Sequence, residues 1–316
     1  MIRRENRQSG FADAFVCPFS TNKTLDRIDN VINWKPLRDQ IEKRYSTSGV
    51  GQPGFPAVTM FKAMLLQQWY DLTDPATEEA INDRLSFRRF LGLSISEKGP
   101  DHSTLHRFRD RIAPIMSELF AEVNRQIDAA GLILRQGTLV DATLIQAAGR
   151  PPAASSEEPP VDPDARWGGK EDCLLYGYKG HIGLDEGSEI IRQAEMTPAN
   201  VHDSQQFKSM VSGDEEAVYA DKAYVSQAYS DWLAEKSIED GILFRATRGH
   251  PLTDIQRLIN RELTAVRRNV EHVFGTMKRI YHWRRCRYFC FERNRCSFLA
   301  LCIAYNLRRR VKLKAI

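Results

Sequence analysis

Long hydrophobic runs are missing from this sequence. The longest one, residues 298–305, has about half of the length that a membrane-spanning helix needs. The first ten residues, MIRRENRQSG, are too polar for the apolar segment of a signal peptide. These two absences predict a protein that is neither embedded in a membrane nor secreted.

Cysteines are few, and they lack the pairing that zinc ribbons show. Six cysteines in 316 residues are too few for a disulfide scaffold. Cys286, Cys290, Cys296 and Cys302 cluster without any Cys-x-x-Cys pair. Zinc is one interpretation of this cluster, but the apolar neighbours and the four-residue step from Cys286 to Cys290 favour packing. We expect reduced cysteines in a cytoplasmic protein.

No Gly-x-x-x-x-Gly-Lys motif occurs, so we expect no nucleotide cofactor bound by a phosphate-binding loop.

The net charge of the chain is also small, at +4. Its distribution is uneven, because residues 278–316 hold twelve Lys and Arg against one acid, Glu292. That segment is +11 and residues 1–277 are −7. A basic C-terminal tail on an acidic body predicts a polyanionic partner.

The first part of the chain has a helical pattern. Residues 1–55 are polar and predict irregular structure. Apolar residues then recur at helical spacing on one face of residues 58–69. Further helices are predicted from Thr77 to about Phe90, from 104 to 112 with Asp101 or Ser103 as cap, and from Pro114 to Gly131.

The second part has a mixed pattern. Strands are predicted over residues 137–145, 178–184, 189–195, 218–221 and 241–245. Residues 150–171 hold five of the 14 prolines and predict a long loop. Thr253 and Gln256 form a capping box that begins a helix over residues 254–281. Further helices are predicted over 229–236 and 296–307.

Three acids occur where their burial needs a reason. Asp141 lies inside an apolar strand and Asp221 ends another, and an acid there is costly unless it is paired or binds a cation. Glu271 lies on the long helix within about 40° of Arg267 and Lys278. Each acid alone fits a turn cap or a solvated ion-pair ladder. Together, carboxylates from two strands and one helix suit two Mg²⁺ ions that act in phosphoryl transfer.

Several segments carry a family resemblance. They are residues 61–70, 84–93, 101–109, 140–143, 197–203 and 220–224, together with Arg267, Glu271 and Lys278 at the spacing of the signature Tyr-x2-Arg-x3-Glu-x6-Lys. With these segments the chain resembles bacterial insertion-sequence DDE transposases, specifically the insertion-sequence-five group of the insertion-sequence-four superfamily. Thr264 replaces the signature tyrosine, which leaves the tyrosine-dependent part of the site unassigned.

The resemblance implies a site and an activity. Asp141, Asp221 and Glu271 would be the catalytic triad and would bind two Mg²⁺ or Mn²⁺ ions, while Arg267 and Lys278 would contact DNA. The enzyme would bind terminal inverted repeats, cut the element ends and join 3′-hydroxyls to target DNA. Its partners would be double-stranded DNA and a second copy of the chain on that DNA, in the bacterial cytoplasm at the nucleoid.

The segment around residue 105 is a candidate DNA-recognition helix. Ser103 and Thr104 can contact phosphates, and Arg107 and Arg109 can pair with guanine edges. An ordinary surface helix is the alternative. His181 and the adjacent pair His202 and Asp203 could suggest a zinc site. No third ligand at a useful spacing stands out beside these two positions, so a structural role is favoured.

The predicted fold class is α/β. We expect an all-helical DNA-binding region over residues 1–131 and a ribonuclease-H-like catalytic core over 132–316, with a mixed sheet and flanking helices. That second domain would include the proline-rich loop 150–171 and the basic C-terminal tail. Two other functions stay open: a DNA-binding relic without catalysis, and a metal nuclease of the same fold that cuts but never joins.

Overall fold

The computed structural model describes residues 22–45, 54–152, 160–169 and 174–314. Two compact units divide the chain: Met1–Ala130 together with Leu299–Ile316, and Gly131–Phe298. The predicted functional division at residue 131 stays a prediction, and the compact units differ from it because the C-terminal segment packs with the helical unit. Within the described residues, no helix has both the length and the apolar character needed to cross a membrane.

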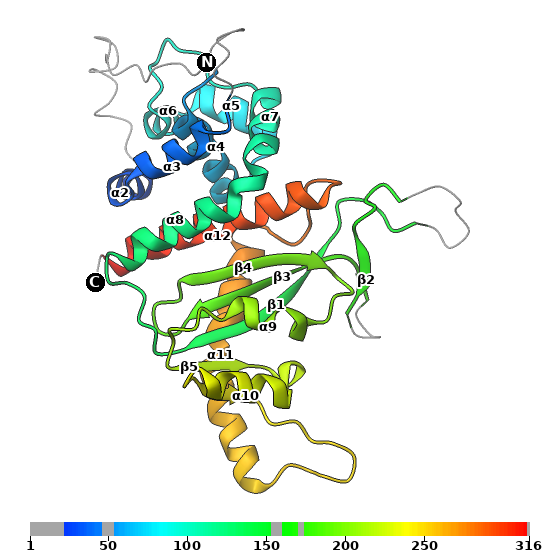
Figure 1. Cartoon of the computed structure of the whole chain (residues 1–316). Coiled ribbons are helices and arrows are strands. Elements are labelled where there is room, and N and C mark those ends of the chain that lie inside the picture. Colours follow the sequence, from blue (N-terminus) through cyan, green and yellow to red (C-terminus); the bar gives the residue numbers. More distant parts are fainter. Residues whose placement is uncertain (1–21, 46–53, 153–159, 170–173, 315–316) are drawn as a thin grey trace. The chain divides into compact units, whose positions relative to one another are not determined.

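The described part of the first unit is helical (Figure 1). Its elements are α2 (Lys23–Val31), α3 (Trp34–Glu42), α4 (Ala57–Tyr70), α5 (Asp74–Asp83), α6 (Leu85–Leu91), α7 (His102–Ile112), the 3-10 turn η2 (Ala113–Ile115), α8 (Met116–Asp128) and most of α12 (Phe291–Leu313). Asp101 caps α7 by accepting a hydrogen bond from the Thr104 backbone N at 2.7 Å, which confirms one of the two predicted caps.

Two helices lie where the sequence predicted irregular structure. Asn22 and Asn33 cap α2 and α3 through their side chains. Each helix buries two apolar residues, Leu25 and Ile28 in α2 and Leu37 and Ile41 in α3. The prediction was wrong because short helices with strong caps need only two apolar residues each, which is too few to show a period.

Helix α4 is buried on all sides rather than on one face, since every residue from Ala57 to Trp69 is buried. Its polar side chains are satisfied internally, as where the Lys62 ammonium donates to the Phe90 carbonyl at 2.9 Å. The predicted helix from Thr77 to Phe90 is two helices, because Arg84 adopts an extended conformation between α5 and α6. Gly92, with φ +70°, ends α6 as predicted.

The basic C-terminal tail is not a solvated tail. Helix α12 buries a continuous segment from Cys296 to Leu307. The Trp69 indole donates to the Ala304 carbonyl at 2.9 Å, and the Arg308 guanidinium stacks over the Trp69 ring. Arg310 is buried. The polyanionic partner predicted for the basic tail therefore cannot be contacted by Arg310, which is buried, while Arg308 is half-buried over the Trp69 ring.

The second unit contains a sheet of six strands. Its elements are β1 (Thr138–Gln146), β2 (Arg166–Gly168), β3 (Leu175–Asp185), β4 (Ile191–Pro198), η4 (Asp203–Gln206), α9 (Phe207–Met210), β5 (Ala217–Ala220), η5 (Lys222–Tyr224), α10 (Gln227–Glu235), β6 (Glu239–Ile242) and α11 (Asp254–Arg279). The capping box at Thr253 and Gln256 is present as predicted. Strand β2 lies within the predicted proline-rich loop, of which residues 153–159 and 170–171 lie outside the described residues.

The sheet is mixed. β3 pairs antiparallel with β1 on one edge and with β4 and β2 on the other. β1 pairs parallel with β5, and β5 pairs parallel with β6. The strand order is therefore β4–β3–β1–β5–β6, with β2 beside β3. β1 is thus central and has a different kind of neighbour on each side.

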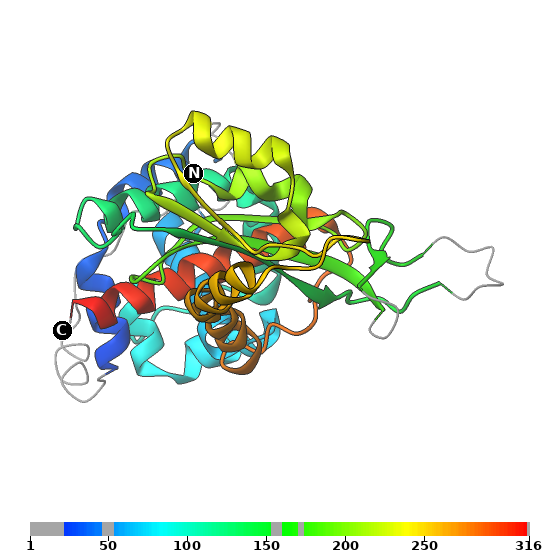
Figure 2. The ribbon, with the colours of Figure 1, turned by 90° about the horizontal axis from the view of Figure 1, so that it is seen from below.

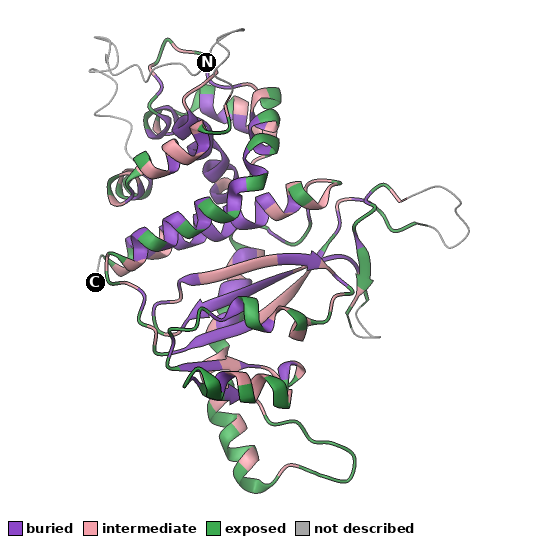
Figure 3. Ribbon diagram, in the orientation of Figure 1, coloured by how far each residue is buried: buried purple, intermediate pink, exposed green. Residues whose placement is uncertain are grey.

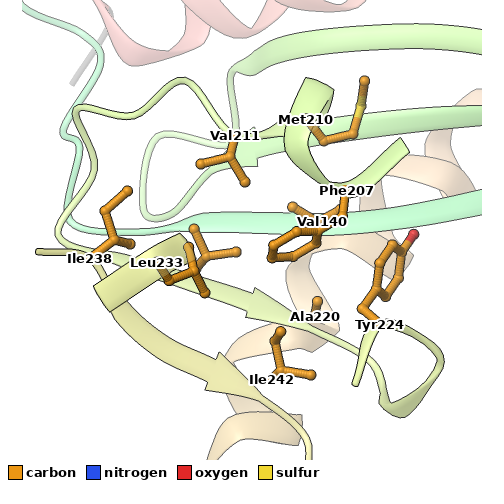
Figure 4. Packing of buried hydrophobic residues seen from close by; sticks show 10 residues of the cluster. Val140, Phe207, Met210, Val211, Ala220, Tyr224, Leu233, Ile238 and Ile242 are labelled. Carbon is orange, nitrogen blue, oxygen red and sulfur yellow. The ribbon is translucent and has the colours of Figure 1, made fainter. Parts of the chain in front are cut away.

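Helices α10 and α11 lie on opposite sides of this sheet (Figure 2). On the α10 side, Val140, Phe207, Val218, Tyr224 and Leu233 belong to one buried cluster (Figure 4). On the other side, α11 buries only its C-terminal half, through Val270, Val273, Phe274 and Met277. Its first half is largely exposed (Figure 3).

The cysteines that the structure describes, Cys286, Cys290, Cys296 and Cys302, form no disulfide bond. Cys302 is fully buried among apolar residues of α12, and this burial raises the pKa of its thiol well above the ordinary value. Cys17 and Cys173 lie outside the described residues.

Candidate active site

Asp141 and Asp221 follow paired positions on two neighbouring parallel strands. The β1–β5 register ends with Val140 opposite Ala220, so the next residue on each strand is an acid. Parallel strands lie about 4.8 Å apart, which places the two acids side by side. β5 ends there, and the Asp221 carboxylate accepts a hydrogen bond from the Ala223 backbone N at 2.7 Å. The sheet thus brings together two acids that are 80 residues apart in the sequence.

The electrostatic surroundings of Asp141 are unfavourable for its charge. Burial raises its pKa to about 6, and the nearby charges of Asp221 and Asp203 act in the same direction. The Arg267 guanidinium, whose Nη2 lies 3.6 Å from Asp141 Oδ2, offsets only part of this effect. The ionised form of this acid is therefore disfavoured, as expected for a carboxylate that binds a cation.

Helix α11 places Glu271 on the face that meets β1. Arg267, one turn before Glu271, pairs with Asp141. Lys278, two turns after it, donates from Nζ to Thr143 Oγ1 at 2.5 Å. Glu271 is exposed and has no hydrogen bond or ion pair to another described residue. The carboxylate is thus free to bind a ligand.

Lys278 is half-buried, and this burial lowers the pKa of its ammonium group, with a smaller contribution from Arg284. Its hydrogen bond to Thr143 fixes the ammonium beside β1, two residues beyond Asp141 on the same face of the strand. A cation held there is suited to an anion that reaches the acids. Thr143 itself was not singled out as a site residue, although its alternation with Asp141 along the strand was a usable signal.

The three acids do not form a cluster that could hold a metal ion in the part of the chain that the structure describes. Within the described ranges, no group of three His, Cys, Asp or Glu side chains is arranged to hold an ion. Asp141 and Asp221 are neighbours, whereas Glu271 lies on the adjoining helix face. The assignment of all three acids to one metal site stays a prediction.

A second polar group includes Lys179 and His181 of β3, on the face of the sheet opposite to Asp141. Lys179 pairs with Asp203 at 2.8 Å and donates to the Val201 carbonyl at 2.8 Å. The His181 ring is fully buried, and its Nε2 lies 2.8 Å from Thr197 Oγ1. Lys179 was missed at the sequence level, where it reads as a single charge within an apolar strand. The hypothesis of a structural role for His181 and Asp203 agrees with these contacts, and no described third ligand joins them.

The buried ring of His181 predicts a pH-dependent stability. Burial lowers its pKa to about 4, against a partly compensating effect of Asp203. Between pH 6.5 and 4 the unfolded chain binds a proton that the folded chain does not, so stability falls as the pH falls. From pH 7 to pH 5 the loss is about 2 kcal/mol. Urea unfolding should show this loss in the wild type and a smaller one in His181→Gln. The control His272→Gln, at an exposed position, should behave as the wild type; equal pH dependence of all three proteins would contradict the prediction.

The candidate recognition helix α7 divides its predicted residues between surface and core. Arg107 is exposed, and its guanidinium donates to Ser103 Oγ and Thr104 Oγ1, both at 3.2 Å. Arg109 is fully buried and bonds to Asp74 and Gln67. Its assignment as a DNA contact is therefore corrected: Arg109 is a structural residue of the helical unit. Ser103, Thr104 and Arg107 remain one polar group, in which Ser103 and Arg107 are exposed and Thr104 is half-buried.

The sheet and the acids at the end of its central strands define a mixed α/β domain with a candidate acidic active site. Residues 133–307 match the family model described as Transposase DDE domain, and this segment covers more than half of the chain. The chain therefore belongs to this family. Residues 16–111 match the model described as Transposase domain (DUF772).

A solved structure is similar at the level of a distant likeness. It is a piggyBac transposase in a synaptic complex with hairpin DNA, with a TM-score of 0.47 and 10% sequence identity. The similarity covers 93% of this chain and 73% of that chain. The segment that matches the DDE family model contains Asp141, Asp221 and Glu271.

Proposed function

We propose that this chain is a DNA transposase of an insertion sequence that cuts the ends of its element and joins the freed 3′-hydroxyls to target DNA. The observation that carries the proposal is the placement of Asp141 and Asp221 side by side at the β1–β5 pair, with the Glu271 face of α11 against β1. Membership of the DDE family supports it. The strand order, with three antiparallel and then two parallel strands, supports a ribonuclease-H-like core.

The residues present fit divalent metal ions. The donor set consists of carboxylate oxygens, which Mg²⁺ and Mn²⁺ prefer. Burial raises the pKa of Asp141 and the charge of Asp221 acts in the same direction, so a bound cation would favour the ionised form of this acid. Asp141, Asp221 and Glu271 would hold the ions, and bound ions would polarise the attacking and leaving oxygens of a phosphodiester.

The remaining side chains prepare the site for DNA. Arg267 neutralises part of the charge of Asp141 when no cation is present, and its guanidinium suits a phosphate of the DNA end. Lys278, held by Thr143, presents an ammonium group beside the same strand. Burial and the charges of Asp141, Asp203 and Asp221 raise the pKa of Tyr224, which keeps its phenol neutral next to the acids. Thr264 Oγ1 donates to the Asn260 carbonyl within its own helix, and so offers no replacement for the signature tyrosine.

The helical unit would find the DNA. Ser103, Thr104 and Arg107 form the polar group on α7 that suits a DNA contact, and Ser103 and Arg107 of this group are exposed. Membership in the insertion-sequence-five group, a dimer on the DNA and a place at the bacterial nucleoid belong to the same proposal.

A cleavage and joining assay tests the proposed function. The purified chain, DNA carrying the inverted repeats that flank its gene, and Mg²⁺ should yield ends with free 3′-hydroxyls and then joined products. Cutting without any joining would assign the chain to the metal nucleases of the same fold. Binding of the ends without cutting, in Mg²⁺ and in Mn²⁺, would identify a DNA-binding relic.

A further inference from the structure

The segment that leads into α11 is a defined element with its own internal contacts. We call residues 243–268 the arm. Asn260 donates to the Phe244 carbonyl at 3.0 Å and accepts from the Phe244 backbone N at 2.9 Å, which fixes the start of the loop to the helix. Thr247 and His250 exchange two backbone hydrogen bonds across a turn at Gly249, whose φ is +83°. The arm extends away from the sheet of its own unit (Figure 1).

The arm is strongly basic and exposed. It contains six arginines and two acids, so it carries +4, as much as the entire chain. Arg245, Arg248 and Arg268 are exposed and make no ion pair with any residue that the structure describes. Among the described residues, Arg267 pairs with Asp141 outside the arm. Within the arm, Asp254 pairs with Arg257 and Glu262 lies 3.7 Å from Arg261, both at exposed positions where ion pairs contribute little.

Three of these arginines form one line that points to the candidate active site. Arg257, Arg261 and Arg268 are four and seven residues apart, which places them within about 40° of one another on α11. Glu271 follows Arg268 by three residues, about 60° further round the helix. The line extends about 21 Å from Arg257 to Glu271 at 1.5 Å per residue.

The exposed apolar residues of α11 in the arm lie beside or opposite this line. Ile255 and Ile259 lie on the side of α11 away from the line, and Leu258 borders it, at about 60–100° from the three arginines. The basic line is therefore a surface of its own. A row of exposed arginines whose acidic neighbours within the arm, Asp254 and Glu262, are themselves exposed suits phosphates, which arginines bind through paired hydrogen bonds.

We propose that Arg257, Arg261 and Arg268, together with Arg245 and Arg248 on the preceding loop, bind the sugar–phosphate backbone of DNA that flanks the phosphodiester in the active site. This inference rests on the proposed function. At 3.4 Å per nucleotide along one strand, the line corresponds to about six nucleotides beyond the reacting position. The contacts carry no sequence preference, because backbone phosphates are the same at every position.

The salt dependence of DNA binding tests the proposal. Binding of a mixed-sequence duplex is measured between about 50 and about 200 mM salt, without metal, for the wild type and for Arg261→Gln/Arg268→Gln. Loss of two phosphate contacts should reduce the slope of log K against log salt by about 1.8. The control Lys208→Gln/Lys236→Gln removes the same charge from side chains that lie over the Trp232 ring, and should keep the wild-type slope.

The proposal would be overturned if the double arginine variant had the wild-type slope, or if the control lost as much of the slope as that variant. It would also be overturned if the double arginine variant changed its molecular mass in solution without a change in slope. The line of arginines would then be an interface between protein chains. Because no cleavage is measured, the outcome is independent of whether the chain cuts transposon ends.

Discussion

Asp141→Asn is expected to abolish cutting and joining of transposon ends, with a fall in rate of about 10³-fold or more. The amide keeps the size of the side chain but cannot supply the negative charge that binds a cation beside Asp221. Glu271→Gln should lose activity to a similar extent. The measurement is the rate at which free 3′-hydroxyl ends appear on labelled end DNA in excess Mg²⁺. Glu262→Gln, at an exposed position on the same helix, is the matched control and should cut normally.

The same substitution separates catalysis from folding. Since burial raises the pKa of Asp141, its charge is disfavoured in the folded, metal-free protein at neutral pH. Asp141→Asn should therefore be at least as stable as the wild type without metal. Added Mg²⁺ should raise the unfolding temperature of the wild type and leave that of the variant unchanged. A variant that still cuts at the wild-type rate would remove Asp141 from the site.

Arg109→Ala is expected to destabilise the helical unit by about 3–5 kcal/mol, because it leaves the carboxylate of Asp74 unpaired. The guanidinium donates to Asp74 at 3.1 Å and to Gln67 at 3.2 Å from a fully buried position. Although burial opposes it, the hydrogen bond and charge of Arg109 lower the pKa of Asp74. This loss is large compared with the 5–15 kcal/mol that typically stabilise a domain.

Hydrogen exchange of the α7 backbone measures this effect within the full chain, where two units need not unfold together. Protection should fall strongly in Arg109→Ala and hardly change in Arg107→Ala, whose side chain is exposed two residues earlier. Arg107→Ala should instead weaken DNA binding. If Arg109→Ala weakened DNA binding while α7 kept full protection, the assignment of Arg109 to the core would be wrong.

The sequence predicted best where local chemistry and long-range structure agree. Asp101 and the Thr253 capping box are caps whose geometry depends only on the next three residues. Asp141 and Asp221 could be identified because an acid in an apolar strand is costly unless it has a function. That the two acids lie side by side follows from the parallel register of β1 and β5, which cannot be read from any local sequence pattern.

Other features depend on contacts between distant residues. Arg109 reads as a surface charge until Asp74, 35 residues earlier, is placed against it. The pairing of Lys179 with Asp203 likewise needs the turn after β4 to return to β3. The arginines near the end of the chain read as a tail because charge is visible in the sequence, whereas the packing of Arg308 on Trp69 is not.

The candidate site also sets a time at which the protein can first act. Asp141, Asp221 and Glu271 lie on β1, β5 and α11, and 130 residues separate the first acid from the last. A ribosome adds about 5–20 residues per second, so roughly 6 to 26 s pass between the synthesis of Asp141 and that of Glu271. The growing chain has a β1 strand without its parallel neighbour until β5 is synthesised, and it has no complete set of acids until Glu271 is added. A chain truncated before α11 should therefore bind DNA at most and never cut the genome that encodes it.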